Sequence, residues 1–355
     1  MKILALYLPA YHQVKINDDV WGEGFTEWDN VKVATPLFKG HKQPIEPINS
    51  NYYDLSKKED IEKQIRLANE YKVDGFIFYH YWFGNNVQAL ERPAEILRYE
   101  IQEKTNYCFC WANHSWFTTW HGKSSKIIVN QEYGKKEEWI KHFNYLLKFF
   151  KDDRYIKVDN KPVIYIYNMS DIKHAKEMFE LWDKMLRKEK FNGIYIVEFI
   201  SSKNVKLSYN ESDAIVEFEP LYTTFFDISK INLLKRFICK KFKMIDFQDY
   251  NNLCKKIVNR KRTYNGKTIQ KGFFCGWDNS ARKGRNSMIV KNSTPQNFED
   301  NLKKLINNNR KDATNDFIII NAWNEWSEGA MLEPTEQNQY KFLEVIKNVV
   351  KENEK

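Results

Sequence analysis

The chain has 355 residues and a mass of 42.7 kDa, and 42% of its residues are hydrophobic, which is enough for a large buried core. Its mean hydropathy of −0.67 and its 29% of charged residues exclude a multi-span membrane protein, and its 15% of aromatic residues exclude a mainly disordered chain. The formal net charge of +9 suggests a polyanionic partner, so the position of that charge along the chain has to be determined.

The first residues, MKILALYLPAYHQ, predict a buried strand rather than a cleavable leader. Pro9 interrupts their apolar run, and the small-residue cleavage site of a secretory signal does not follow. No stretch reaches the roughly 20 apolar residues that cross a membrane. The five cysteines are odd in number and have neither zinc-site nor disulfide-framework spacing. We therefore expect buried free thiols and a cytoplasmic protein.

Eight short apolar runs alternate with helical patterns along the chain. The runs are rich in β-branched and aromatic residues and are apolar on both faces, which is typical of parallel strands covered on both sides. Ser56 and Glu59 have the spacing of a capping box at the start of the first long helix. The predicted strands are 3–8, 75–81, 107–111, 163–167, 194–199, 214–218, 272–275 and 317–321, and the clearest predicted helices are 57–71, 137–150, 174–189, 296–308 and 337–350.

This alternation predicts an α/β fold, a (β/α)8 barrel of the TIM type. A doubly wound sheet is the alternative, but the run Pro9 to His12 stands where that fold has a glycine-rich phosphate loop. The segment 223–271 is rich in Lys and Asn and fits the alternation least well, so we interpret it as a basic, helical insertion between the sixth and seventh strands. We expect residues 1–355 to form a single catalytic barrel.

The carboxyl ends of the strands form the active face of such a barrel, so the side chains that follow each strand are candidates for the site. Nine of the eleven tryptophans follow these ends, together with Asn, His and carboxylates. Aromatic rings suit the C–H faces of sugars, and the polar groups suit sugar hydroxyls. Lys and Arg are sparse in these loops, which disfavours nucleic acid as the ligand. The candidate substrate-binding residues are Tyr11, His12, Trp21, Glu27, Trp28, His80, Tyr81, Trp82, Trp111, Asn113, His114, Trp116, Glu219, Trp277, Asp278, Asn324, Trp326 and Glu333.

Glu325 and Glu328, in the segment WNEWSEG, are the candidate catalytic pair. Cleavage or transfer at a glycosidic bond needs one protonated carboxyl for the leaving oxygen and one ionised group that assists the attack. Trp323 and Trp326 would desolvate one carboxyl and raise its pKa, which separates the two roles. A solvated acidic loop is the alternative interpretation of the same two residues.

Other chemistries have less support in the sequence. The histidines that follow the strand ends come mostly from separate loops without the HExxH spacing, so no metal site is predicted. A G-x-S-x-G nucleophile motif is lacking, and Ser327 has no base near it in the sequence. We expect neither a metal nor another cofactor.

An ordered set of motifs resembles the WbsX family, whose members are usually described as glycosyltransferases of bacterial O-antigen or capsule synthesis. The motifs are LALYLPAYHQ, WGEGFTEWDNV, PLFKGHKQP, DGFIFYHYWF, CFCWAN, RYIKVDNKPVIYIY, GWDNSARKGR, STPQNFEDNL and INAWNEWSEGAMLEP. They extend from the first strand to about Tyr340. The family is related to glycoside hydrolase family 99, the endo-α-mannosidases with a (β/α)8 barrel.

The resemblance implies specific roles for the glutamates. Glu325 would act as a base on the sugar 2-hydroxyl to give a 1,2-anhydro intermediate, and Glu328 would act as acid and then as base, with retention of configuration. One departure lies at 111–116, where many relatives have WANENW and this chain reads WANHSW. His114 is therefore expected to change the hydroxyl contacts or the charge of a sugar-facing loop.

Three functions remain open from the sequence. The leading hypothesis is an enzyme that acts on glycosidic bonds of a bacterial surface polysaccharide with hydrolase-like chemistry. The first alternative is a glycosyltransferase that uses a sugar nucleotide or a lipid-linked sugar, although we find no clear D-x-D motif on a Rossmann-like strand. The second alternative is a catalytically silent glycan-binding protein.

The positive charge lies in one segment. Residues 230–271 hold 13 Lys and Arg against 2 Asp, an excess of +11, which leaves −2 for the rest of the chain. A solvated basic helix is the simpler interpretation. Contact with anionic lipid is the other, because apolar residues such as Leu233, Leu234 and Phe237 alternate with the basic ones. In that case the protein would be peripheral at the inner membrane.

Overall fold

The computed structural model describes residues 1–118, 126–201, 210–309 and 317–354. Eight parallel strands form a closed barrel like that of a TIM barrel, in which β1 pairs with both β2 and β14. The α/β barrel and all eight predicted strands are confirmed, with strand ends that differ by at most four residues. The barrel strands are β1 (Lys2–Tyr7), β2 (Gly75–Gly84), β4 (Asn106–Trp111), β8 (Lys161–Ile166), β9 (Tyr195–Ile200), β10 (Ala214–Glu217), β12 (Thr268–Phe274) and β14 (Phe317–Asn321).

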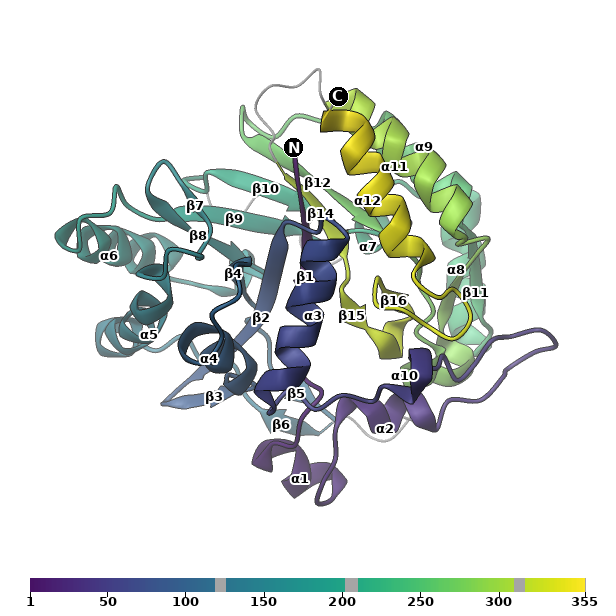
Figure 1. Cartoon of the computed structure of the whole chain (residues 1–355), viewed down its shortest axis with the longest axis horizontal. Helices are drawn as coiled ribbons and strands as arrows, with labels where there is room; N and C mark the ends of the chain where they lie inside the picture. The colour runs from purple at the N-terminus through teal and green to yellow at the C-terminus, as the bar shows by residue number, and fades with distance from the viewer. Residues whose placement is uncertain (119–125, 202–209, 310–316, 355) are drawn as a thin grey trace.

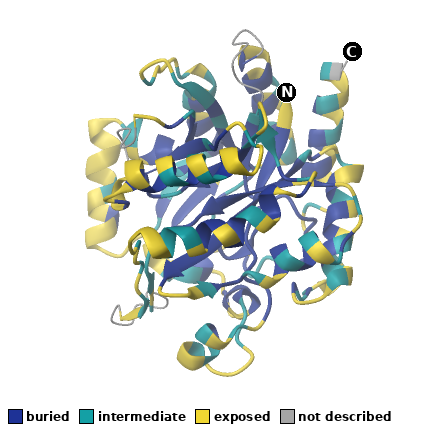
Figure 2. Cartoon of the chain, turned by 90° about the vertical axis from the view of Figure 1, so that its left-hand side faces the viewer, coloured by how far each residue is buried: buried dark blue, intermediate teal, exposed yellow. Residues whose placement is uncertain are grey.

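Helices cover the outside of the barrel (Figure 1). Each has an apolar face toward the strands, so buried and exposed residues alternate along it, whereas the strands behind are mostly buried (Figure 2). Between β9 and β10 the described residues contain no helix. The outer helices are α3 (Lys58–Glu70), α4 (Arg92–Tyr99), α5 (Lys136–Phe150), α6 (Ala175–Lys188), α9 (Tyr250–Asn259), α11 (Pro295–Asn309) and α12 (Lys341–Glu354).

Two details at helix starts differ from the prediction. Ser56 does not cap α3, because its hydroxyl donates to Asp54 Oδ1 at 2.7 Å and the helix begins one residue after Lys57. The last helix begins at Lys341 rather than near Gln337. Gln339 has a positive φ of 51° and its amide closes a turn onto Thr335, so the chain cannot become helical before that point.

The segment 223–271 is not an insertion as a whole. Its last helix, α9, connects β10 to β12 outside the barrel and packs against α11, which is the ordinary place of a barrel helix. Tyr250 fixes α9 to the barrel by donating from its hydroxyl to Phe274 O at 2.7 Å. The segment also contains the end of α7 (Leu221–Phe226), then α8 (Lys230–Lys241) and β11 (Asp246–Asp249), and its last residues begin β12; β11 pairs with β13 (Met288–Lys291).

The loops at the carboxyl ends of the strands lie together at the lower end of the barrel in Figure 1, while both chain termini lie near the upper end. Among the described residues, no helix is long and apolar enough to cross a membrane. All five cysteines are buried free thiols, as expected. The short elements of this lower end are α1 (Lys15–Trp21), α2 (Glu27–Lys32), β3 (Val87–Ala89), β5 (Trp116–Phe117), β6 (Ile127–Val129), α7 (Leu221–Phe226), α10 (Ser280–Lys283), β15 (Asn324–Glu325) and β16 (Ala330–Met331).

Candidate active site

Glu325 and Glu328 lie on a tight hairpin directly after β14. Strands β15 and β16 pair antiparallel, and the turn between them, Trp326–Glu328, is closed by the Gly329 amide, which donates to Trp326 O at 3.1 Å. Gly329 has a φ of 60°, and a Cβ at this position would lie 2.8 Å from the backbone of Asp278. Glycine is therefore required where this hairpin meets the loop after β12.

The hairpin is fixed to the end of β1 by buried polar groups. The Asn324 side chain accepts from Leu8 N at 2.7 Å and donates to Leu8 O at 3.0 Å, as a neighbouring strand would. The hydroxyl of Tyr11 donates to Asn324 O at 2.6 Å and accepts from Trp326 N at 3.2 Å. These bonds hold both glutamates on a rigid support.

The guanidinium of Arg282, on α10, joins three carboxylates. Its Nη1 donates to Glu328 Oε1 at 2.9 Å, and its Nε and Nη2 donate to Glu27 Oε1 at 2.9 and 2.6 Å. Its Nη2 also lies 3.7 Å from Glu325 Oε2. Burial lowers the pKa of Arg282, but its attraction to Glu27, Glu328 and Glu325 outweighs burial and raises that pKa well above its ordinary value. The cation is thus fixed beside both candidate catalytic groups.

The environment of Glu325 favours its protonated form. Burial raises its pKa to about 8, with a further contribution from Glu328, while Arg282 acts in the opposite direction. Its Oε2 is buried and accepts no hydrogen bond within the described structure. Glu328 is instead ion-paired with Arg282. The two carboxyls of the hairpin therefore lie in different environments, one buried and the other in an ion pair.

A pocket of about 250 Å³ lies beside this pair and brings together candidates from separate loops. Its polar side includes Arg282, which is ion-paired with Glu328, and Glu27, which is ion-paired with Arg282. Its aromatic side includes Trp116, whose ring packs edge-on against Tyr81 at 5.1 Å. Five of the predicted binding residues line it: Trp21, Glu27, Tyr81, His114 and Trp116.

A second group of the predicted binding residues forms a buried layer under the hairpin. Trp28 donates from Nε1 to Tyr53 O at 2.8 Å and its ring lies 5.4 Å from that of Trp326. Trp326 Nε1 and Tyr53 Oη both donate to Glu333 Oε2 at 2.7 Å. Burial raises the pKa of Glu333 to about 7. With Tyr11 and Asn324, these side chains support the hairpin and do not line the pocket.

Three predicted binding residues lie on the outer face of the barrel, under α5. His80 Nε2 lies 2.9 Å from Nε2 of His142, and burial lowers the pKa of His80 to about 3. Trp82 stacks on the same His142 ring at 4.7 Å, and Trp111 meets that ring edge-on at 4.7 Å. Strand neighbours point to opposite faces, so Tyr81 faces the pocket while His80 and Trp82 face the helix.

The remaining predicted binding residues lie at four other places. Asn113 is fully buried and ties its loop to Asn168, whose amide donates to Asn113 Oδ1 at 2.8 Å. Trp277 and Asp278 border another hollow, of about 520 Å³, where Asp278 accepts from His41 Nε2 at 2.8 Å. His12 is buried, and burial lowers its pKa to about 4.

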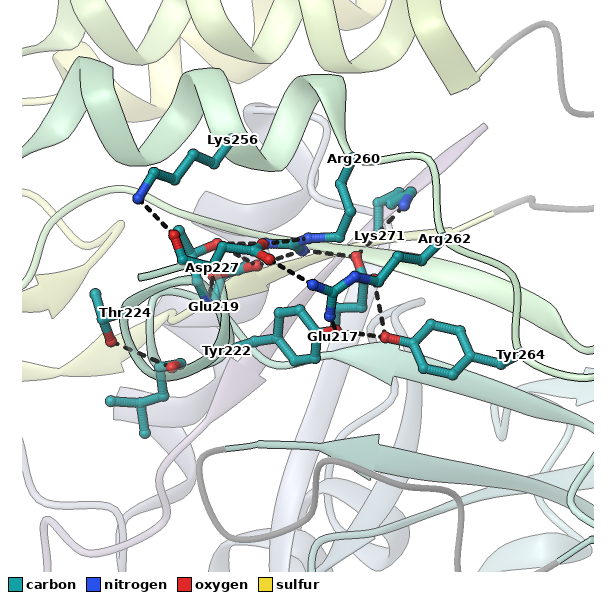
Figure 3. A network of polar contacts seen from close by, with 12 residues as sticks. Glu217, Glu219, Tyr222, Thr224, Asp227, Lys256, Arg260, Arg262, Tyr264 and Lys271 are labelled. Carbon is teal, nitrogen blue, oxygen red and sulfur yellow. Dashed lines mark hydrogen bonds and ion pairs between the residues drawn. The ribbon is translucent and has the colours of Figure 1, made fainter. Parts of the chain in front are cut away.

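Glu219, the last of the predicted binding residues, lies in a buried network around Arg260 (Figure 3). Its Oε1 accepts from Arg260 Nη1 at 2.8 Å and from the Thr223 hydroxyl at 2.9 Å. The polar atoms of Glu219 are thus used within the protein. Trp120, one of the nine tryptophans counted from the sequence, lies outside the described residues.

Three side chains at the site are not among the predicted site residues. Arg282 belongs to the segment GWDNSARKGR, but nothing in its spacing indicates that it reaches three carboxylates. Tyr79 and Tyr167 are close enough to Glu325 for its charge to contribute to the raised pKa of both hydroxyls, in addition to burial. The alternation of side chains along the second strand was the signal that could have placed Tyr79 beside Tyr81.

The chain is similar in sequence to a known protein family and to curated proteins. A family model described as "Glycosyltransferase WbsX" matches residues 3–346. The "Uncharacterized protein WxcX" of Xanthomonas campestris pv. campestris is 28% identical over 351 residues, which are 98% of this chain and 49% of that protein. The chain thus spans about half the length of the curated relatives it matches.

Solved structures share the fold at low sequence identity. A "Glycoside hydrolase-like protein" aligns with a TM-score of 0.59 and 14% identity over 98% of this chain and 93% of the other. The GH99 endo-alpha-mannosidase from Bacteroides thetaiotaomicron aligns with a TM-score of 0.57 and 15% identity over 99% and 96% of the two chains. At this level of identity the likeness shows the fold alone.

Proposed function

Because the chain belongs to the WbsX glycosyltransferase family of carbohydrate-active enzymes, and its fold resembles glycoside hydrolases, we propose that it acts on glycosidic bonds through Glu325 and Glu328. The observation that carries the proposal is the pair itself. Burial raises the pKa of Glu325 to about 8, Glu328 is ion-paired to Arg282, and an aromatic pocket lined by Arg282 lies beside them. This is the protonation pattern that acid–base chemistry at a glycosidic oxygen requires.

The proposed reaction is retaining. A base takes the proton of the sugar 2-hydroxyl, whose oxygen attacks the anomeric carbon, while an acid gives its proton to the leaving oxygen. The resemblance described above implies that Glu325 is the base and Glu328 the acid. Burial favours the protonated form of Glu325 in the free protein, so these roles require transfer of a proton from Glu325 to Glu328 when substrate binds. Arg282 lies beside both groups and can stabilise whichever carboxylate remains ionised.

The proposed substrate is a glycan of a bacterial surface polysaccharide, of the O-antigen or capsule type. This proposal follows the resemblance described above, and the pocket, which combines Trp21, Tyr81 and Trp116 with polar side chains, suits a sugar ligand. A glycosyltransferase that takes its sugar from a nucleotide or a lipid carrier is the second candidate function, favoured by the family description itself.

The test compares the wild-type protein with Glu325→Gln and Glu328→Gln. Each is incubated with α-linked oligosaccharides alone and with oligosaccharides plus sugar nucleotides, and products are followed by mass spectrometry and NMR. New reducing ends of retained configuration that either substitution abolishes support the proposal, whereas nucleotide release supports transfer. Glycan binding without turnover in all three proteins would identify a silent binding protein and overturn the enzyme proposal.

A further inference from the structure

Helix α8 carries an unusual concentration of exposed apolar side chains. Seven of the fifteen exposed large apolar side chains in the described part of the chain lie between residues 231 and 244. Ile231 is 80% exposed, Phe237 and Phe242 are each 63% exposed, and Leu234 is 60% exposed. A soluble domain rarely leaves such a contiguous apolar patch without a binding partner.

The apolar side chains share one face of α8. At 100° per residue, Leu233, Leu234, Phe237, Ile238 and Ile231 fall within about half of the helix circumference. The opposite face carries Cys239, which is the buried residue of this helix. The exposed face is therefore the outward face of an amphipathic helix whose other side is already packed.

The helix is held in this orientation by Arg236. Its Nη1 donates to Thr224 O on α7 at 2.6 Å, and its Nε donates to Asp246 Oδ2 on β11 at 3.0 Å. The guanidinium also lies over the Phe225 ring, 4.2 Å from its centroid. These contacts on two neighbouring elements prevent α8 from turning its apolar face inward.

The underlying support is rigid as well (Figure 3). Asp227, at the end of α7, is ion-paired with Arg260 at 2.6 Å and with Arg262 at 2.7 Å, and its carbonyl accepts from Lys256 at 2.7 Å. Arg260 in turn is ion-paired with Glu217, at the end of β10. A continuous set of buried ion pairs thus connects the barrel wall to the elements that carry α8.

The charge of residues 228–245 indicates which kind of partner could cover the exposed face of α8. Residues 228–245 contain six Lys and Arg and no Asp or Glu. A second copy in twofold contact would place six cations against six, which is unfavourable. An anionic lipid surface satisfies both features, because apolar side chains enter the acyl boundary while Lys side chains meet the headgroups.

We propose that α8 docks the protein on an anionic membrane. A pocket of about 490 Å³ lies under the packed side of α8 and is lined by the basic side chains Arg236, Lys240, Lys243 and Lys283, with Asp246 as its acidic member. Lys283 belongs to α10 and directly follows Arg282, so the docking face adjoins the catalytic end of the barrel. The inference rests on α8 alone and does not depend on the reaction catalysed.

The experiment measures co-sedimentation of the whole protein with phosphatidylglycerol vesicles and with phosphatidylcholine vesicles. Binding is expected to the anionic vesicles at about 0.1 M salt and to weaken strongly at about 1 M salt. Leu234→Ser is expected to lower the partition coefficient roughly tenfold. Lys241→Glu is expected to lower it by a similar factor, because it reverses one headgroup contact.

The matched controls are Val33→Ser and Lys188→Glu. Val33 is 61% exposed on another face, and Lys188 is an exposed lysine of α6. Both controls should bind vesicles as the wild type does, and all variants should melt at the same temperature. Absence of binding to anionic vesicles, or equal losses in Val33→Ser and Leu234→Ser, would overturn the proposal. So would a wild-type dimer in light scattering that Leu234→Ser converts to a monomer, since a second copy would then cover α8.

Discussion

The burial of Glu325 affects both the proposed chemistry and the stability of the protein. Its pKa is raised to about 8 by burial and by the nearby charge of Glu328. Loss of this proton leaves two carboxylates and no acid, whichever glutamate donates to the leaving group. We therefore expect kcat/KM to fall as the pH rises through about 8, since kcat/KM reports the ionisation of the free enzyme. A pH profile on a soluble oligosaccharide checks this, and a profile that stays flat from pH 6 to about pH 9 would contradict it.

The same pKa predicts how Glu325 affects stability. The ordinary pKa of this carboxyl is 4.5, and in the folded protein it is about 8. Between these values the folded state holds a proton that the unfolded chain lacks, so the free energy of unfolding falls as the pH rises. Glu325→Gln removes this titration and should melt above the wild type at pH 8, by roughly 1–2 °C for each kcal/mol gained.

The melting difference should shrink toward pH 5, where both states of the wild-type carboxyl approach protonation. Scanning calorimetry at the two pH values measures it. Glu180→Gln, on the exposed side of α6, is the control for amide substitution in general. If Glu325→Gln were less stable than the wild type at pH 8, the attraction between the Glu325 carboxylate and Arg282 would outweigh the cost of burying that carboxylate.

Within a strand, the alternation of side chains separates residues that pack against a helix from residues that line the pocket. His80 and Tyr81 are neighbours in β2, but His80 faces α5 and Tyr81 lines the pocket. His80→Leu leaves the buried Nε2 of His142 without its partner, which should cost about 1–3 kcal/mol of stability and leave turnover unchanged. Tyr81→Leu should change KM or kcat with a smaller effect on the melting temperature. Thermal melts measure the predicted loss of stability, and steady-state kinetics measure the predicted change in KM or kcat, for both variants.

Features made of residues that are contiguous in the chain could be predicted from the sequence, whereas contacts between distant residues could not. The eight strands and the position of Glu325 and Glu328 just after the last strand follow from local patterns, because the apolar runs and the WNEWSEG segment are contiguous in the chain. The three-way contact of Arg282 and the packing of His142 under Trp82 join residues far apart in sequence, and no local pattern encodes them. The segment 223–271 was misjudged because its basic surface obscured the buried positions Leu253, Cys254 and Ile257 of an ordinary barrel helix.

For the molecule as a whole, the charge is divided unevenly between two parts of the chain. The basic segment that includes α8 carries +11, whereas the rest, with the candidate catalytic pair, carries −2. If α8 serves docking and the hairpin serves chemistry, the two should be separable by substitution. Leu234→Ser should turn over a soluble oligosaccharide within about twofold of the wild type, because Leu234 is exposed and lies outside the pocket.

On a glycan anchored in anionic vesicles the same variant should be roughly tenfold slower, in proportion to its lost partitioning. Glu325→Gln should show the reverse pattern, with wild-type vesicle binding and turnover reduced by about 10²-fold or more on both substrates. Parallel assays of the two variants on the two substrates measure all four rates. A Leu234→Ser variant equally impaired on the soluble and the anchored glycan would show that α8 supports the active site and not membrane docking.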